Sequence, residues 1–147
     1  MRTLLLAAAA ALALSGCGGP LSWIPGGRLD GTLVAAPVTD WSFTDAVQKI
    51  QLETAPDDPY SVNVWCVAQA DHLWITAGSH TNTWVKNLIA DPRVRVRVGD
   101  QIYERLAVRV TDPLEAKLVV SLYDKKYHYD RDQGGFLGPM QFRLDPR

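Results

Sequence analysis

Apolar and polar residues alternate along the middle of the chain, which is the pattern of strands that bury one face. In the clearest example, Val62, Val64 and Cys66 share one face, whereas Asn63 and Trp65 lie on the other. Short polar turns separate this run from its neighbours, so we expect three consecutive strands. They span residues 50–54, 60–68 and 72–76, after a short helical turn at 41–47.

The period changes from two to about 3.6 residues after a polar loop at 78–82. Four apolar residues are then spaced to form one broad face of a helix: Trp84, Val85, Leu88 and Ile89. We expect this helix over residues 83–90. Asp91-Pro92 ends it, because the residue before a proline avoids the helical conformation.

Arginine and valine alternate along the next strand, and a second long strand follows after Gly99-Asp100, which predicts a hairpin. The two strands span residues 93–98 and 101–111. A two-residue turn sets Arg95 opposite Glu104, whereas a three-residue turn sets Val98 opposite Ile102. The longer turn matches the apolar faces better, so we favour it.

Asp112, Pro113 and Glu115 form a helix start, with an N-cap, a proline at the first position and an acidic first turn. This helix is expected to end near Tyr127, and a last strand is expected over 140–144. The order is three strands, a short helix, two strands, a helix and a strand. It predicts a mainly β (α+β) fold, a six-stranded antiparallel split β-barrel with two short flanking helices.

The N-terminal residues have the pattern of a signal peptide. Arg2 precedes an unbroken run of Leu and Ala over residues 4–14, which is too short to span a bilayer but has the length of a signal-peptide core. Leu14-Ser15-Gly16-Cys17 resembles the lipobox of bacterial lipoproteins, which implies lipidation of Cys17. The alternative is an ordinary secretory signal that contains a cysteine.

This leader divides the chain and gives it a location. We expect a lipoprotein signal peptide at 1–16, a lipidated Gly/Pro-rich tether at 17–40 and a barrel domain at 41–147. The lipid on Cys17 would hold the domain to the membrane at the periplasmic face of the cell envelope. Gly18 in place of an aspartate favours the outer membrane where there is one.

Charge and cysteine usage narrow the function classes. The chain has 15 basic and 16 acidic side chains, so it lacks the field that attracts nucleic acid. Cys66 is the only thiol left once Cys17 is acylated, and its apolar strand face favours a buried small residue over a reactive nucleophile. No His-x-x-x-His or Cys-x-x-Cys spacing occurs, so we expect no metal site.

A resemblance to a known family begins at the first helix and the strand after it. They read Trp84-x-x-Asn87-Leu88-x-x-Asp91-Pro92-x-Val94-x-Val96-x-Val98-Gly99. This run resembles the pyridoxamine 5′-phosphate oxidase-like split β-barrels, and it is most similar to their deazaflavin-dependent nitroreductase branch. The residues from Phe142 to Arg147 resemble the closing strand of such barrels. The resemblance covers about residues 43–112 and the last few positions.

The resemblance implies an oxidoreductase that acts on a small molecule, with FMN or a deazaflavin in a groove between the subunits of a homodimer. The cofactor phosphate would lie against the strand-to-helix loop, where helix N–H groups favour an anion. The implied cofactor-binding residues are Gly78, Ser79, His80, Thr81, Asn82, Trp84 and Lys86.

Two features leave a non-catalytic alternative open. Residues 77–83 contain no lysine or arginine, and an exported protein would need a supplied cofactor. The same fold could serve without a cofactor as a binding or assembly lipoprotein. We interpret at least three of the five tryptophans as packing residues. We also interpret the arginines of the hairpin as a solvated face rather than an anion grip: Arg93, Arg95, Arg97, Arg105 and Arg109.

Overall fold

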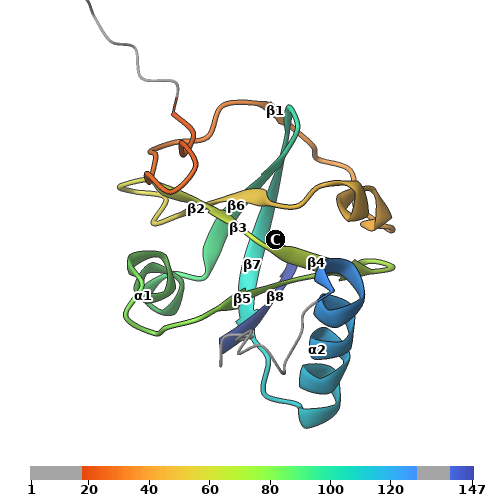
Figure 1. Ribbon diagram of the computed structural model, residues 1–147. Helices are drawn as coiled ribbons and strands as arrows, with labels where there is room; N and C mark the ends of the chain where they lie inside the picture. Colours follow the sequence, from red (N-terminus) through yellow and green to blue (C-terminus); the bar gives the residue numbers. More distant parts are fainter. Residues whose placement is uncertain (1–17, 129–139) are drawn as a thin grey trace, which may run out of the picture.

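The computed structural model describes residues 18–128 and 140–147. Within them, one antiparallel sheet follows the path β3-β2-β6-β7-β8-β5-β4, and β1 pairs in parallel with β7 beside it (Figure 1). The elements are β1 (Thr32–Leu33), the 3-10 helix η1 (Ser42–Ala46), β2 (Ile50–Thr54), β3 (Tyr60–Val64), β4 (Cys66–Gln69), β5 (His72–Ala77), α1 (Thr83–Ala90), β6 (Arg93–Val98), β7 (Gln101–Arg109), α2 (Pro113–Tyr127) and β8 (Met140–Pro146).

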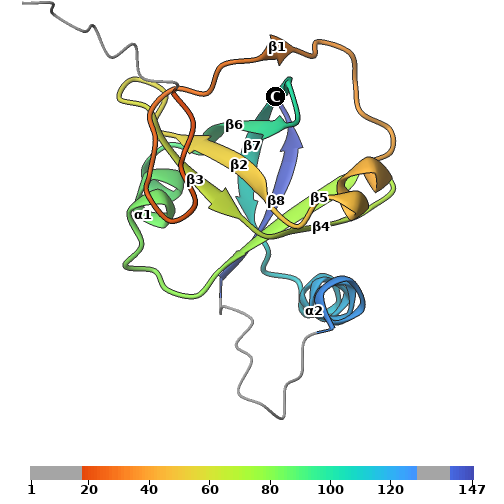
Figure 2. The same ribbon diagram turned by 45° about the horizontal axis from the view of Figure 1, so that its top comes forward.

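The sheet curls because its two end strands are consecutive in the chain. β3 ends at Val64 and β4 begins at Cys66, so only Trp65 separates the two ends of the sheet path. The strands therefore surround a common interior, with α1 and α2 on opposite sides (Figure 2). The predicted split β-barrel is confirmed, but the described sheet has eight strands rather than six.

Part of that difference arises at Trp65, where the predicted single strand over 60–68 is broken. The Trp65 carbonyl accepts a hydrogen bond from the Tyr123 hydroxyl at 2.9 Å, so α2 takes the place of a strand partner here. The Trp65 side chain stacks on Tyr127, with ring centroids 4.8 Å apart. The chain thus leaves one end of the sheet and joins the other at this residue.

The barrel interior is apolar. Its largest fully buried members include Trp41, Ile50, Leu52, Ile75 and Leu144. Each such side chain contributes about 1.5–3 kcal/mol by leaving water. A second cluster lies beneath α2 and consists of Val67, Trp74, Val119 and Tyr123. Trp41, Trp74 and Trp84 are all buried, which confirms that at least three tryptophans are packing residues.

The segment before Trp41 lies along the sheet. Gly26 and Ser61 exchange two backbone hydrogen bonds of 2.8–2.9 Å, and Leu29 is 1% exposed. A Cβ on Gly26 would lie 2.5 Å from the backbone carbon of Gly19, so only glycine fits this close approach. This segment also places β1 at the edge of β7, where Leu33 pairs with Ile102.

Both predicted helices are confirmed. In α1, Trp84, Val85 and Leu88 are buried, but Ile89 is 65% exposed, so the apolar face is narrower than predicted. In α2, the Asp112 side chain accepts a hydrogen bond from the Leu114 N–H at 3.0 Å, as expected of an N-cap.

The hairpin register favoured from the sequence is wrong. The turn has two residues, so that Val98 pairs with Gln101 and Arg95 pairs with Glu104. Gly99 has φ +59°, which a type II′ turn requires at its first position. The matching of apolar faces failed as a guide because the N-terminal segment covers Ile102: a Cβ on Gly31, just before β1, would lie 2.9 Å from Ile102 Cγ1. Ile102 is therefore fully buried without an apolar partner on β6.

Candidate functional site

The loop between β5 and α1 contains five of the predicted cofactor-binding residues. Ser79 is half-buried, and the other four are exposed: Gly78, His80, Thr81 and Asn82. Hydroxyl groups bond to each other within the loop, because Ser79 Oγ lies 2.7 Å from Thr81 Oγ1. Ser79 Oγ also accepts from the Thr81 N–H at 3.1 Å. The loop thus presents polar groups to solvent, and part of their bonding capacity is used internally.

The first turn of α1 supplies the donors that an anion would need. The Asn82 carbonyl accepts from Val85 and Lys86, both at 3.1 Å, and the Asn82 side chain makes no capping bond. The N–H groups of Thr83 and Trp84 precede the first intrahelical donors, so they are available to an anion. The backbone of this turn has the polarity that a phosphate requires.

The two remaining predicted residues diverge from the loop. Trp84 is 8% exposed and belongs to the core cluster, whereas Lys86 is exposed on the surface of α1. A Cβ added to Gly78 would meet no atom within 4 Å, so the loop backbone is open to approach from that side. Open backbone, hydroxyls and helix amides fit a phosphate, and Lys86 is the one cation among these residues.

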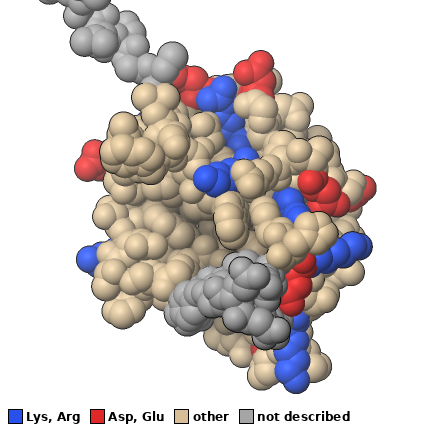
Figure 3. Space-filling model, viewed as in Figure 1, with Lys and Arg blue, Asp and Glu red and all other residues tan. Residues whose placement is uncertain are grey.

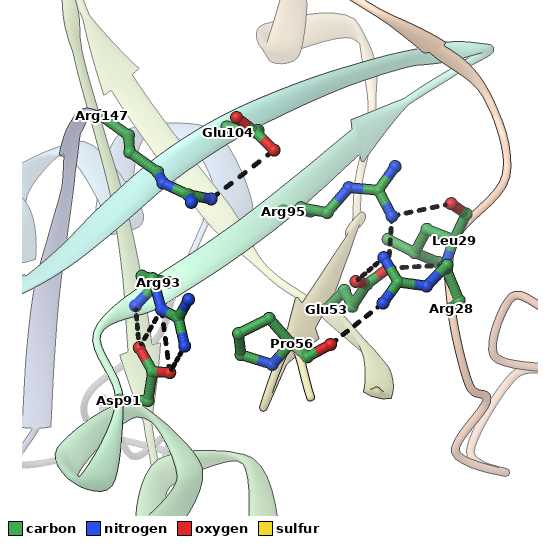
Figure 4. A network of polar contacts seen from close by, with 9 residues as sticks. All are labelled: Arg28, Leu29, Glu53, Pro56, Asp91, Arg93, Arg95, Glu104 and Arg147. Atoms are coloured by element: carbon green, nitrogen blue, oxygen red, sulfur yellow. Dashed lines mark hydrogen bonds and ion pairs between the residues drawn. The ribbon is translucent and has the colours of Figure 1, made fainter. Parts of the chain in front are cut away.

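On the outer face of β6, Arg93 and Arg95 are paired with carboxylates (Figure 4), and Arg97 Nε donates to the Gly99 carbonyl at 2.9 Å. Arg93 Nε donates to Asp91 at 3.0 Å, and this hydrogen bond lowers the pKa of Asp91 to about 2. Arg95 donates to the Glu53 carboxylate at 3.0 Å and to the Leu29 carbonyl at 3.1 Å. Both arginines thus bond to groups of the protein itself. The side chain of Arg95 is only 19% exposed, so the predicted solvated face is in part covered by the N-terminal segment.

Glu53 is the centre of this outer network. It is 1% exposed, and its carboxylate accepts from the Leu29 N–H at 2.6 Å as well as from Arg95. Arg28 lies 3.7 Å from its other oxygen. The network therefore fastens the N-terminal segment to β2 and β6, which is a structural role.

Arg105 does not belong to that solvated face, contrary to the prediction. From β7 it pairs with Val94 of β6, its side chain lies on the same side of the hairpin as Tyr103, and it is 5% exposed. Its Cζ atom lies 4.8 Å from the centroid of the Trp41 ring. The sequence did contain a signal for this placement, since Arg105 lies two residues from Tyr103 and from Ala107 and so shares their face.

Cys66 is buried, as predicted. Burial raises the pKa of its thiol, although the Lys126 ammonium lies 3.7 Å from the sulfur and opposes this shift. Lys126 donates to the carbonyls of Thr44 and Cys66 at 2.8–2.9 Å, and it thereby joins α2 to η1 and β4. A buried, neutral thiol in this position is a packing residue.

Among residues 18–128 and 140–147, no three His, Cys, Asp or Glu side chains come close enough together to hold a metal ion. His72 pairs with Asp71 at 2.6 Å and stacks on Trp74. The predicted lipidation residue Cys17 lies outside the described residues, so its role stays a prediction.

Three solved structures have the same fold. An F420-H2 dependent reductase, FDR-A, has a TM-score of 0.56 at 18% identity, over 67% of this chain and 95% of its own. HutZ, the heme storage protein from Vibrio cholerae, has a TM-score of 0.58 at 20% identity, over 72% and 86%. A structure described as a domain-swapped dimer has a TM-score of 0.56 at 18% identity, over 67% and 81%.

At these identities the solved structures establish the fold alone. No curated protein matches the chain. A protein-family model does match it over residues 58–136, more than half of its length and including the β5–α1 loop. The family resemblance inferred from the sequence is thereby confirmed. The chain belongs to the F420H(2)-dependent quinone reductase family of flavin- and deazaflavin-type split β-barrels.

Proposed function

We propose that the protein is an oxidoreductase that holds a deazaflavin or a flavin at the β5–α1 loop and acts on a small-molecule acceptor. The observation that carries this proposal is the family match, which includes this loop and the helix after it. The structural neighbour named as an F420-H2 dependent reductase supports a deazaflavin over FMN. When bound, such a cofactor supplies the hydride, and the protein supplies its position.

The residues of the loop would hold the cofactor phosphate. Gly78 leaves the backbone open, the hydroxyls of Ser79 and Thr81 supply side-chain donors, and the first amides of α1 face an anion favourably. Lys86 would add a single cation. Because Lys86 is a single cation and is exposed to solvent, we expect the phosphate contact to be weak and to weaken further with salt.

A homodimer is part of this proposal. It is supported by the structural neighbour described as a domain-swapped dimer. Apolar side chains on different elements are also exposed in the single chain, among them Phe43, Trp65 and Val108, each at 40–42%. A second copy that covers them would bury this surface.

One observation favours a second candidate, a binding or assembly module without a cofactor. Ser79 and Thr81 bond to each other, and the Thr81 amide donates to Ser79. One hydroxyl proton and one amide are thereby used within the loop, which leaves fewer donors for a phosphate. A retained scaffold that no longer binds a cofactor would show such internal bonding.

A titration separates the two candidates. The full chain, purified in a non-ionic detergent, is mixed with F420, FMN or haem, and binding is followed by absorbance and by quenching of cofactor fluorescence. We expect saturable binding of F420 that weakens at least about tenfold, or 1.4 kcal/mol, in the double variant Ser79→Ala/His80→Ala. The control His72→Ala/Ser121→Ala removes the same residue types from outside the loop and should bind as the parent does. Absence of binding to F420, FMN and haem would overturn the first candidate.

We also propose that the protein is a lipoprotein of the cell envelope, anchored through Cys17. A tight turn near the start of the described chain supports this. Leu21 and Ile24 exchange backbone hydrogen bonds of 3.0 and 2.6 Å, and Trp23 at the tip is 85% exposed. The lobe that contains this turn is almost uncharged in Figure 3. A rigid turn with an exposed tryptophan suits the interface of a bilayer.

Among the described residues, no helix is both long and apolar enough to cross a membrane. The anchor is tested by expression of the full chain in a bacterium with a labelled fatty acid. We expect label and membrane fractionation in the parent protein and neither in Cys17→Ser. Equal fractionation of Cys17→Ser with the membrane would contradict the lipid anchor.

A further inference from the structure

Arg105 is a buried charge whose Nε atom has no hydrogen-bond partner in the described part of the protein. The guanidinium lies over the Trp41 ring, and the Trp41 Nε1–H is likewise buried and unpartnered there. Both are N–H donors, and an unmade hydrogen bond in a buried place is costly. Arg105 and Trp41 therefore present two buried N–H donors without a hydrogen-bond acceptor, and one of these donors carries a positive charge.

The nearby carboxylates do not supply that acceptor. Asp145 is held by Arg143, whose Nε and Nη2 lie 2.6 and 3.0 Å from its two oxygens. Glu104 lies 3.5 Å from Arg147 at the protein surface, and both are about 40% exposed. Each of these acids thus neutralises another arginine.

A cavity of about 310 Å³ opens beside Arg105. One wall is the mainly apolar segment that follows β1, and the other consists of β7 and the C-terminus. The lining residues are Leu33, Val34, Ala35, Ala36, Pro37, Tyr103, Glu104, Arg105, Pro146 and Arg147. Its volume is at the lower end of small-molecule sites, which span roughly 300–1000 Å³.

We propose that this cavity is a binding site for a small organic monocarboxylate. The carboxylate accepts from the Arg105 guanidinium, which can offer two parallel N–H groups to two oxygens. The short apolar body of the ligand lies against residues 33–37. At the rim, Glu104 and Arg147 pair with each other, so Arg105 is the one buried and uncompensated charge among the lining residues. This favours one negative charge over the two of a phosphate. This site lies on β7 and beside the C-terminus, apart from the β5–α1 loop, so it does not depend on the proposed cofactor.

The test is a calorimetric titration of the full chain in a non-ionic detergent with hexanoate and benzoate. Hexanol and benzyl alcohol are the matched neutral ligands, and inorganic phosphate is the matched dianion. We expect saturable binding of at least one carboxylate, and no binding of the alcohols or of phosphate. Binding should fall at least tenfold in Arg105→Met and remain unchanged in Arg97→Met, which removes an arginine of the outer face.

A second variant keeps the proposal testable if Arg105→Met is poorly folded. Ala36 is exposed at the cavity, so Ala36→Phe is expected to narrow the cavity without disturbing the core, and it too should weaken binding. Absence of saturation with either acid up to about 10 mM, the weak end of specific affinity, would overturn the proposal. So would equal affinity in the parent protein, Arg105→Met and Ala36→Phe.

Discussion

Arginines on the two faces of the β6–β7 hairpin have opposite surroundings. On the outer face, Arg93 and Arg95 each bond to a carboxylate at 3.0 Å. On the inner face, Arg105 is more deeply buried than either of them, yet its Nε atom bonds to nothing among the described residues. Its guanidinium instead packs over the Trp41 ring and lines a cavity.

The difference separates arginines that hold the fold from one that does not. A buried ion pair is costly to break, because the remaining partner stays buried without compensation. A buried arginine without an acid leaves no such partner behind. Arg95 therefore stabilises the fold, whereas burial of Arg105 lowers the free energy of unfolding. A destabilising charged residue of this kind is expected where the residue is retained for a ligand.

The largest effect is expected for Arg95→Met, which leaves the Glu53 carboxylate 1% exposed without its main counter-charge. We expect the free energy of unfolding to fall by about 3 kcal/mol or more. Urea unfolding at neutral pH, followed by tryptophan fluorescence, measures this change. Arg97→Met is the matched control: its acid, Asp100, is 95% exposed, so a loss below about 1 kcal/mol is expected.

Arg105→Met is the opposite case on the inner face. Methionine has a similar length and packs well on an aromatic ring, and no carboxylate loses its partner. We expect the free energy of unfolding to remain the same or to rise by up to about 1 kcal/mol in the same urea experiment. A loss as large as that of Arg95→Met would show that Arg105 holds the fold, and the contrast between the two faces would disappear.

Much of the fold was predictable from local patterns. The strands over 50–54 and 93–98 and the helix over 83–90 have the predicted bounds, because alternation and helical spacing act over a few residues. The break at Trp65 was not predictable, since it depends on Tyr123 and Tyr127 far along the chain. The hairpin register failed for the same reason, because the segment that covers Ile102 comes from another part of the sequence.

The candidate site was less predictable than the fold. The motif located the β5–α1 loop, but it could not show that Ser79 and Thr81 bond to each other. All the hairpin arginines were predicted to face solvent, because a charged residue on a strand usually faces water. Arg95 is instead largely covered, and Arg105 lies on the other face. The alternation of Arg105 with Tyr103 and Ala107 favoured an inward position, and the register, in which Arg105 pairs with Val94, shows it.

The smallest effect is expected at the end of the outer face, where Arg93 lowers the pKa of Asp91 to about 2 from an ordinary value of 3.8. A carboxyl whose pKa is lower in the folded state stabilises the fold above its unfolded value. That contribution is lost as the pH falls through the folded value. The stability of the parent protein should therefore decline more steeply between about pH 4 and pH 2 than that of Asp91→Asn. Urea midpoints measured across this window check the difference.

Asp57→Asn serves as the control for this prediction. The Asp57 carboxylate lies 3.7 Å from the same guanidinium but is 94% exposed, so the curve of Asp57→Asn should follow that of the parent protein. Parallel curves for all three proteins would mean that the Asp91–Arg93 contact does not persist in solution.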